Sequence, residues 1–159
     1  MIPFRNIRSA IVQSSSAELN MPLVEMNGSG PAAPYPYITY DFTDIPDPTS
    51  GLAAVSFDGL NKTHEETVEF TVSFQSYADY KDESIENAMK LRDWFLTAGH
   101  QKLKDDVNVV VARVGAIQNR DVRVGNEWER RNGFDVDFRT VNTIVTSELP
   151  IESADIQRS

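Results

Sequence analysis

The sequence predicts an α+β fold in which two helices pack on a mixed, largely antiparallel β-sheet. Three observations predict it. Residues 68–74 and 134–138 alternate apolar and polar side chains, as strands with one buried face do. Residues 4–11 and 84–99 carry apolar side chains at helical spacing. These helical segments are too few for the repeated βαβ units of a doubly wound fold.

The chain opens with a short amphipathic helix, in which Phe4, Ile7 and Ile11 form one apolar stripe. Residues 23–26 predict a brief strand. Residues 27–31 combine asparagine, glycine and proline, so we expect a loop there, because the first two tolerate positive φ and proline fixes φ.

A second strand is expected to enter the sheet only from Tyr37, because Pro34 and Pro36 would interrupt a central ladder. Residues 41–48, rich in aspartate and proline, are expected to lead away from the sheet. The weak pattern of residues 49–63 predicts a long hairpin or a mobile excursion. We assign it to partner contact, since a compact domain rarely keeps a long structureless loop without a use.

The helix at 84–99 has Asp82 or Ser84 as its cap and Gly99 near its end. Trp94 falls on the side away from its apolar stripe. Such an aromatic side chain either contacts another subunit or is covered by a neighbouring loop of the same chain. The predicted stripe consists of Ile85, Ala88, Met89, Leu91, Phe95 and Leu96.

Residues 107–114 are rich in β-branched residues and apolar on both faces, which predicts a strand in the middle of the sheet. The last strand changes phase beyond Thr140. Apolar side chains then stand at Val141 and Val145 with Ile144 between them, and a bulge or bend near Thr140 would explain this.

The 159 residues are expected to form a single domain, 1–159, with the excursion at about 45–64. The segment at about 149–159 predicts a tail whose order depends on a partner.

Composition excludes several classes of protein. With 24 acidic and 15 basic side chains the formal net charge is -9, which argues against a protein that grips DNA, because that affinity comes from clustered lysine and arginine. The lack of cysteine excludes disulfides and thiolate metal sites. Residues 1–20 contain no unbroken apolar stretch, so neither a signal peptide nor a membrane span is expected there.

Two sets of side chains could carry chemistry. His64 and Glu66 would share one face of a strand and could bind a divalent metal, although two ligands do not complete a site. Asp135 and Asp137 could hold Mg²⁺ as in a nuclease, but the nearby arginines favour surface or intersubunit ion pairs. We expect no catalytic residue, no bound metal and no cofactor.

The order of these segments resembles the neck or tail terminator proteins of long-tailed bacteriophages, which complete the tail and join it to the head. The resemblance covers roughly residues 5–147. It is carried by the opening helix, the Pro-Tyr entry at 34–37, the strand at 68–77, the helix at 84–99, and Trp128-Glu129-Arg130-Arg131 before Phe134-Asp135-Val136-Asp137-Phe138.

The resemblance implies a tail-terminator-like α+β subunit that closes into a ring, a homohexamer, on the tail tube. Such a ring ends tube polymerisation and joins the tail to the head connector. Its implied partners are copies of itself, the tail-tube protein and the head-side connector or adaptor. It would act in the virion after assembly in the host cytoplasm, with DNA passing through its bore without specific binding and with no membrane.

The same resemblance gives the site residues that we expect. The expected subunit interface contains Trp94, Trp128, Glu129, Arg130 and Arg131, with the two arginines meeting carboxylates of a neighbouring subunit. Because carboxylates repel DNA, some of Glu65, Glu66, Glu69, Asp135 and Asp137 are expected to face the bore. The alternative function is that of another virion part, such as a tail-tube or head-completion subunit. A metal-dependent hydrolase is the third hypothesis.

Overall fold

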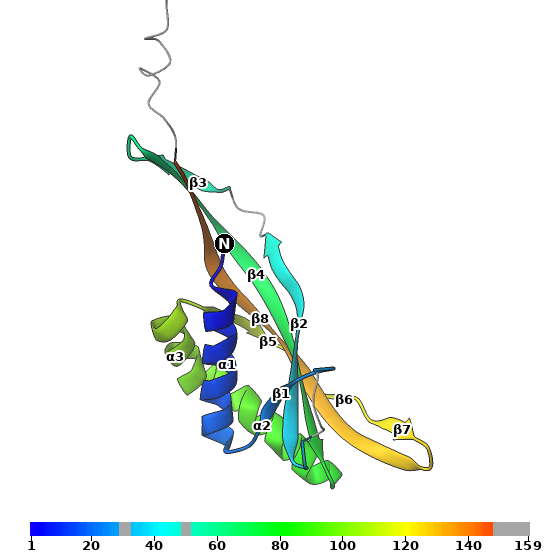
Figure 1. Ribbon diagram of the computed structural model, residues 1–159. Helices are drawn as coiled ribbons and strands as arrows, with labels where there is room; N and C mark the ends of the chain where they lie inside the picture. Colours follow the sequence, from blue (N-terminus) through cyan, green and yellow to red (C-terminus); the bar gives the residue numbers. More distant parts are fainter. Residues whose placement is uncertain (29–32, 49–51, 148–159) are drawn as a thin grey trace, which may run out of the picture.

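The computed structural model describes residues 1–28, 33–48 and 52–147 (Figure 1). Its helices lie together on one face of an eight-stranded sheet, which confirms the α+β class. No helix within these ranges is long and apolar enough to cross a membrane. The elements are α1 (Phe4–Leu19), β1 (Leu23–Glu25), β2 (Tyr37–Pro48), β3 (Ala54–Phe57), β4 (Asn61–Ala78), α2 (Lys81–Leu96), α3 (Ala98–Val107), β5 (Val110–Val114), β6 (Gln118–Asn119), β7 (Val122–Val124) and β8 (Glu127–Ser147).

The sheet is mixed and largely antiparallel, as predicted. Its strand order is β1-β2-β4-β8-β5, with β3 added to β4 and with β6 and β7 added to β8. Only β1 and β2 run parallel among the described pairs. The predicted brief strand at 23–26 is therefore confirmed as β1, which lies at one margin of the sheet.

Strands β4 and β8 form the long axis of the molecule (Figure 1). Their register runs without a shift from the pair Asn61 and Ser147 to the pair Ala78 and Arg130. The predicted bulge near Thr140 is therefore wrong. The apparent change of phase has another cause: β8 continues beyond the helices, so its apolar side chains no longer need to stand on one side.

The core lies between the helices and the even-numbered residues of these two strands. Phe74 packs against Phe95 of α2 and Phe134 of β8, with ring centroids 5.1 and 5.7 Å apart. Burying a side chain of this size contributes about 1.5–3 kcal/mol. The strand residues that are buried on this face are Val68, Phe70, Val72, Phe74, Phe134, Val136 and Phe138.

Helix α2 is rotated relative to the predicted stripe. Met89 and Leu96, expected in the core, are exposed. The buried side contains polar residues that hydropathy does not reveal, since Ser84 Oγ donates to the Ser76 carbonyl (2.8 Å) and accepts from Asn132 Nδ2 (3.0 Å). The buried residues of the helix are Ser84, Asn87, Ala88, Leu91, Trp94 and Phe95.

The helix also ends earlier than predicted, and a further helix follows. Thr97 has φ -124° and ψ -107°, so α2 stops before it and α3 begins at Ala98. Gly99 therefore stands in the first turn of α3. A third helix was not predicted, because its buried side chains are few: Gly99 and Leu103.

Two predictions about strand position are wrong. Residues 41–48 stay in the sheet as part of β2, which beyond Tyr40 has no partner on its outer side within the described chain, and prolines are tolerated on such an edge. The strand in 107–114 is β5, which lies at the end of the strand order and not in its middle. Its β-branched residues reflect strand propensity and not burial on both sides.

Candidate assembly surfaces

The far end of the sheet projects beyond the helices as an arm (Figure 1). We call residues 54–67 and 141–147 the distal arm. It contains β3, the start of β4 and the end of β8. The predicted excursion at 45–64 is thus largely strand: its hairpin alternative holds for β3 and β4, which turn at Asp58–Asn61. Residues 49–51 and the predicted tail at 149–159 lie outside the described residues.

Both faces of the distal arm expose large apolar side chains. Val55 and Ile144 flank His64 across the sheet, on the face that carries the helices further along. Phe57, on the same face, is 56% exposed, and Val145 on the opposite face is 59% exposed. The part of this surface in β3 lies in the segment assigned to partner contact, whereas the part in β8 was not predicted as a site. The run of uncharged, β-branched residues after Thr140 is the signal that could have revealed it.

A second projection stands at the other end of the molecule. We call residues 122–131 the proximal ribbon; it consists of β7 and the start of β8, joined through Gly125, whose φ is +64°. Residues 128–131 therefore belong to a strand, β8. Trp128 is 54% exposed. A hollow of about 320 Å³ beside it is lined by Tyr35, Ala78, Asp79, Val124, Glu127, Trp128, Glu129 and Arg130.

The two arginines predicted at an interface have partners in their own chain. Arg130 Nη1 lies 3.2 Å from Asp121 Oδ2, and Arg131 Nε lies 2.8 Å from Glu129 Oε1. Asp121 also accepts a hydrogen bond from the Arg131 backbone N–H (2.8 Å). These ion pairs lie within one subunit, and they join residues of the proximal ribbon to one another and to Asp121, which directly precedes it.

A stack of tyrosines leads from the body to this ribbon. Tyr37 stacks on Tyr35 and Tyr77, with centroids 5.6 and 4.8 Å apart, and the Arg131 guanidinium lies 5.5 Å from the Tyr77 centroid. Burial raises the pKa of the Tyr35 and Tyr37 phenols, and the Glu129 carboxylate raises both further. The stack was not predicted from the sequence.

Trp94 is covered by its own chain, which is the second of the two explanations given above. It is 5% exposed and packs on Phe95 with ring centroids 5.1 Å apart. Gly99 of α3 approaches the indole so closely that a Cβ there would lie 2.6 Å from its ring carbons. The single chain thus leaves little of Trp94 for a neighbour.

The predicted bore residues divide between the two faces of the sheet. Glu65, Glu69, Asp135 and Asp137 stand on the open face, which is the face opposite the helices, whereas Glu66 stands on the helix side. The open-face carboxylates are partly neutralised, because Glu69 Oε2 lies 3.1 Å from Arg139 Nε and Asp135 Oδ1 lies 3.3 Å from Arg120 Nη2.

The structure does not bring the candidate metal ligands together. His64 and Glu66 stand on the helix side of the distal arm, while Asp135 and Asp137 stand on the open face beside the body. Asp137 accepts a hydrogen bond from Thr71 Oγ1 (2.7 Å). Within the described residues no group of three or more histidine, aspartate or glutamate side chains is placed to hold a metal ion.

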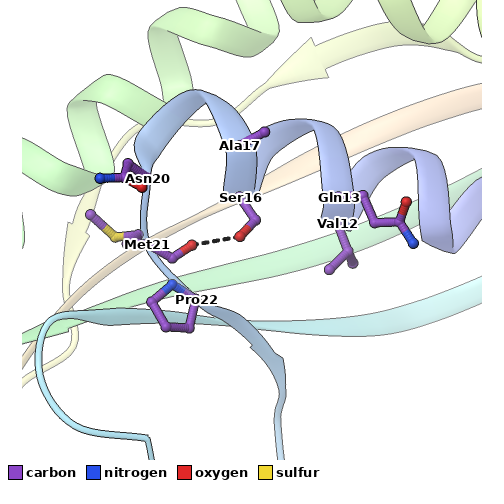
Figure 2. A pocket seen from close by; sticks show the side chains of 7 residues that line it. All are labelled: Val12, Gln13, Ser16, Ala17, Asn20, Met21 and Pro22. Atoms are coloured by element: carbon purple, nitrogen blue, oxygen red, sulfur yellow. Dashed lines mark hydrogen bonds between the residues drawn. The ribbon is translucent and has the colours of Figure 1, made fainter.

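An open hollow of about 600 Å³ lies beside the C-terminal half of α1 (Figure 2). Ser16 Oγ donates to the Met21 carbonyl (2.7 Å) at its margin. None of its lining side chains is charged or titratable, so it has no group for acid–base or nucleophilic chemistry. The lining residues are Val12, Gln13, Ser16, Ala17, Asn20, Met21 and Pro22.

The fold and these surfaces define a class: a subunit with a helix-covered body and two projecting β-ribbons whose apolar side chains are exposed, as in components of an assembly. A family model described as phage neck terminator protein matches residues 6–158, and the chain belongs to this family. The family is a structural one of the virion neck. No curated protein sequence matches the chain.

Proposed function

We propose that this chain forms a closed ring, a homohexamer, at the phage neck. The ring caps the tail tube, ends its polymerisation and joins the tail to the head-side connector. The observation that carries the proposal is the distal arm, in which β4 and β8 extend beyond their helices and expose apolar side chains on both faces. A chain that worked alone would bury or shorten such an arm.

The proposed partners are sister copies, the tail-tube protein and the head-side connector. Assembly takes place in the host cytoplasm and needs no cofactor or membrane. Trp128 supplies a further contact, because an exposed indole at the tip of a ribbon is typical of an interface anchor. Glu129, Arg130 and Arg131 hold the ribbon in place for this contact through their bonds within the chain.

We further propose that the open face of the sheet looks on to the bore. Its carboxylates exceed its guanidinium groups, so DNA passes without adhering to it. Glu66 belongs to the opposite face and has no part in this. The open-face carboxylates are Asp41, Asp44, Glu65, Glu69, Glu129, Asp135 and Asp137, against Arg113, Arg120, Arg131 and Arg139.

A tube-elongation assay tests the proposed function. Purified tail-tube protein is allowed to polymerise with and without this chain, and the tubes are measured by negative-stain microscopy. We expect short tubes with a ring at one end. Tubes that keep growing in its presence would refute the terminator role, and self-extension of this chain into long tubes would identify a tube subunit instead.

A further inference from the structure

We propose that neighbouring copies are joined by strand addition along the distal arm, with the free edge of β8 in one copy pairing with the free edge of β3 in the next. This inference rests on the proposed ring and names the contact that closes it. It is carried by backbone geometry, by the absence of charge on both edges and by the placement of three exposed apolar side chains.

Three hydrogen bonds show which residues of β8 direct their backbone groups away from β4. The carbonyl groups of Arg131, Asp135 and Thr143 accept from the backbone N–H groups of Arg120 (2.9 Å) and Gly115 (2.8 Å) and from the Met1 ammonium (2.9 Å) respectively. None of these donors belongs to β4. Backbone groups alternate along an antiparallel strand, so the odd-numbered residues of β8 direct their N–H and C=O groups outward.

Beyond Arg139 this outward edge has no strand partner within the described chain. Strand β5 pairs with β8 from Val136 to Arg139 and goes no further. The outward groups of Val141, Thr143 and Val145 are therefore available, apart from the bond between the Met1 ammonium and the Thr143 carbonyl. Unpaired N–H and C=O groups on a strand edge are a template for another strand.

Strand β3 offers a second edge on the other side of the arm. The Asp58 N–H donates to the Asn61 carbonyl (3.0 Å), so by the same alternation Val55 and Phe57 direct their backbone groups away from β4. Among the described strands β3 pairs only with β4. Each arm thus carries two free edges, one on either side.

The distribution of charge favours a second copy of this chain as the partner that pairs with these edges. Residues 140–147 and 54–57 contain no charged side chain, whereas the whole chain carries a formal net charge of -9. Two copies repel each other at most approaches, and contact between two uncharged edges avoids that cost. Natural proteins normally protect such an edge with lysine, proline or a bulge. Its lack of protection fits an edge that is occupied in the assembly.

The side chains match across the proposed seam. Val55, Phe57 and Ile144 stand on the same face of the arm and are all exposed. If each copy keeps its helices on the same side, Ile144 of one copy meets Val55 or Phe57 of the next as a cross-strand apolar pair. Because the joined edges differ, the contact is head-to-tail and repeats until a ring closes.

Amide hydrogen exchange, resolved to single residues, tests this inference on the full-length protein. The exchange rates are compared between the monomer and the protein assembled on purified tail tubes. We expect the amides of Val141, Thr143 and Val145 to exchange rapidly in the monomer and roughly 100-fold more slowly in the ring. Val55 and Phe57 should follow them. The amides of Asn142 and Ile144 point toward β4 and should be slow in both states, which provides an internal control.

Variants at Val145 complete the test. V145P removes an outward N–H without breaking a bond to β4, and it should lower the fraction of ring at least about tenfold, whereas V145T should assemble normally. Should V145P not fold, V145K places a charge on the same edge with the same expectation. The inference would be overturned, while the ring stays intact, if these amides exchange freely in the ring or if only contact with the tube protein protects them. Normal assembly of V145P or V145K would overturn it as well. A chain that never forms a ring would overturn the proposed function as well.

Discussion

At the scale of single residues, the contact between Trp94 and Gly99 shows how one side chain fixes the path of the backbone. The indole lies under the first turn of α3, where only a hydrogen atom fits between it and the Gly99 Cα. Helices α2 and α3 can therefore follow each other with only Thr97 between them. The close approach, and not positive φ, is what requires glycine here.

Replacing Gly99 by alanine tests this contact. The added Cβ would lie 2.6 Å from two carbons of the Trp94 ring, so the helices must separate, and we expect a loss of about 1–3 kcal/mol in the free energy of unfolding. Urea denaturation measures it. Ala98→Ser, at an exposed neighbouring position, should change stability by less than about 0.5 kcal/mol. Equal effects of the two variants would mean that the indole can move aside.

The tyrosine stack makes a prediction about pH. Burial first, and then nearby negative charge, raises the pKa of Tyr35 and Tyr37 above the ordinary value of 10.0. The folded state thus favours the neutral phenols. Their contribution to stability is complete below pH about 10 and is lost as the pH rises through the folded-state pKa.

Titration of tyrosinate absorbance, with thermal unfolding measured in parallel, checks this prediction. We expect Tyr37→Phe to lose less stability than the wild type when the pH is raised above about 10, because phenylalanine keeps the stack and cannot ionise. An equally steep loss in the variant would show that other groups govern the alkaline transition.

At the scale of elements, the body and the distal arm differ in what covers them. Phe70 and Phe57 lie on the same side of the sheet, but the first is 1% exposed beneath the helices and the second is 56% exposed beyond them. The same alternation of side chains therefore builds a core in one half of the sheet and an exposed apolar surface in the other.

This difference predicts opposite effects of truncation. Phe70→Ala should lower the free energy of unfolding by about 3–5 kcal/mol, because it leaves a cavity in the core. Phe57→Ser should leave the stability of the monomer within about 0.5 kcal/mol of the wild type and should impair ring formation. Thermal unfolding and native mass spectrometry measure the two effects. A large loss of monomer stability in Phe57→Ser would show that the arm packs on its own chain.

Local periodicity was sufficient to predict the elements whose one face is buried by their own chain. Helix α1 and the helix-facing parts of β4 and β8 belong to this group. It failed for α3, in which only Gly99 and Leu103 are buried, and for the rotation of α2, where Ser84 is buried through its bonds to Ser76 and Asn132. Hydropathy cannot reveal a polar residue whose bonds are completed by distant strands.

The candidate surfaces were predicted less well, for a related reason. The exposed Ile144 and Phe57 follow ordinary strand patterns, and only the extent of the helices decides that they remain uncovered. Arg130 and Arg131 looked free in the sequence, but Asp121 and Glu129 pair with them after folding. The family was within reach because the order of elements is a property of the whole chain, which the family model matches over residues 6–158.

At the scale of the whole molecule, the long shape arises because the two central strands are much longer than the region that the helices cover. Strands β4 and β8 contain 18 and 21 residues, while the helices cover the second part of β4 and the middle of β8. The structure is thus a compact body with an uncovered distal arm, and in the proposed ring this arm pairs with the distal arm of another copy. In this proposal, contact between the uncharged edges avoids the repulsion that a net charge of -9 gives to other approaches of two copies.

A cryo-electron microscopy map of the virion neck tests the central claim most directly. The account predicts a closed ring of this chain between the tail tube and the head connector, in which the end of β8 in each copy continues into β3 of the next. A map that places the chain elsewhere in the virion, or a neck ring whose distal arms are separated by solvent, would contradict it.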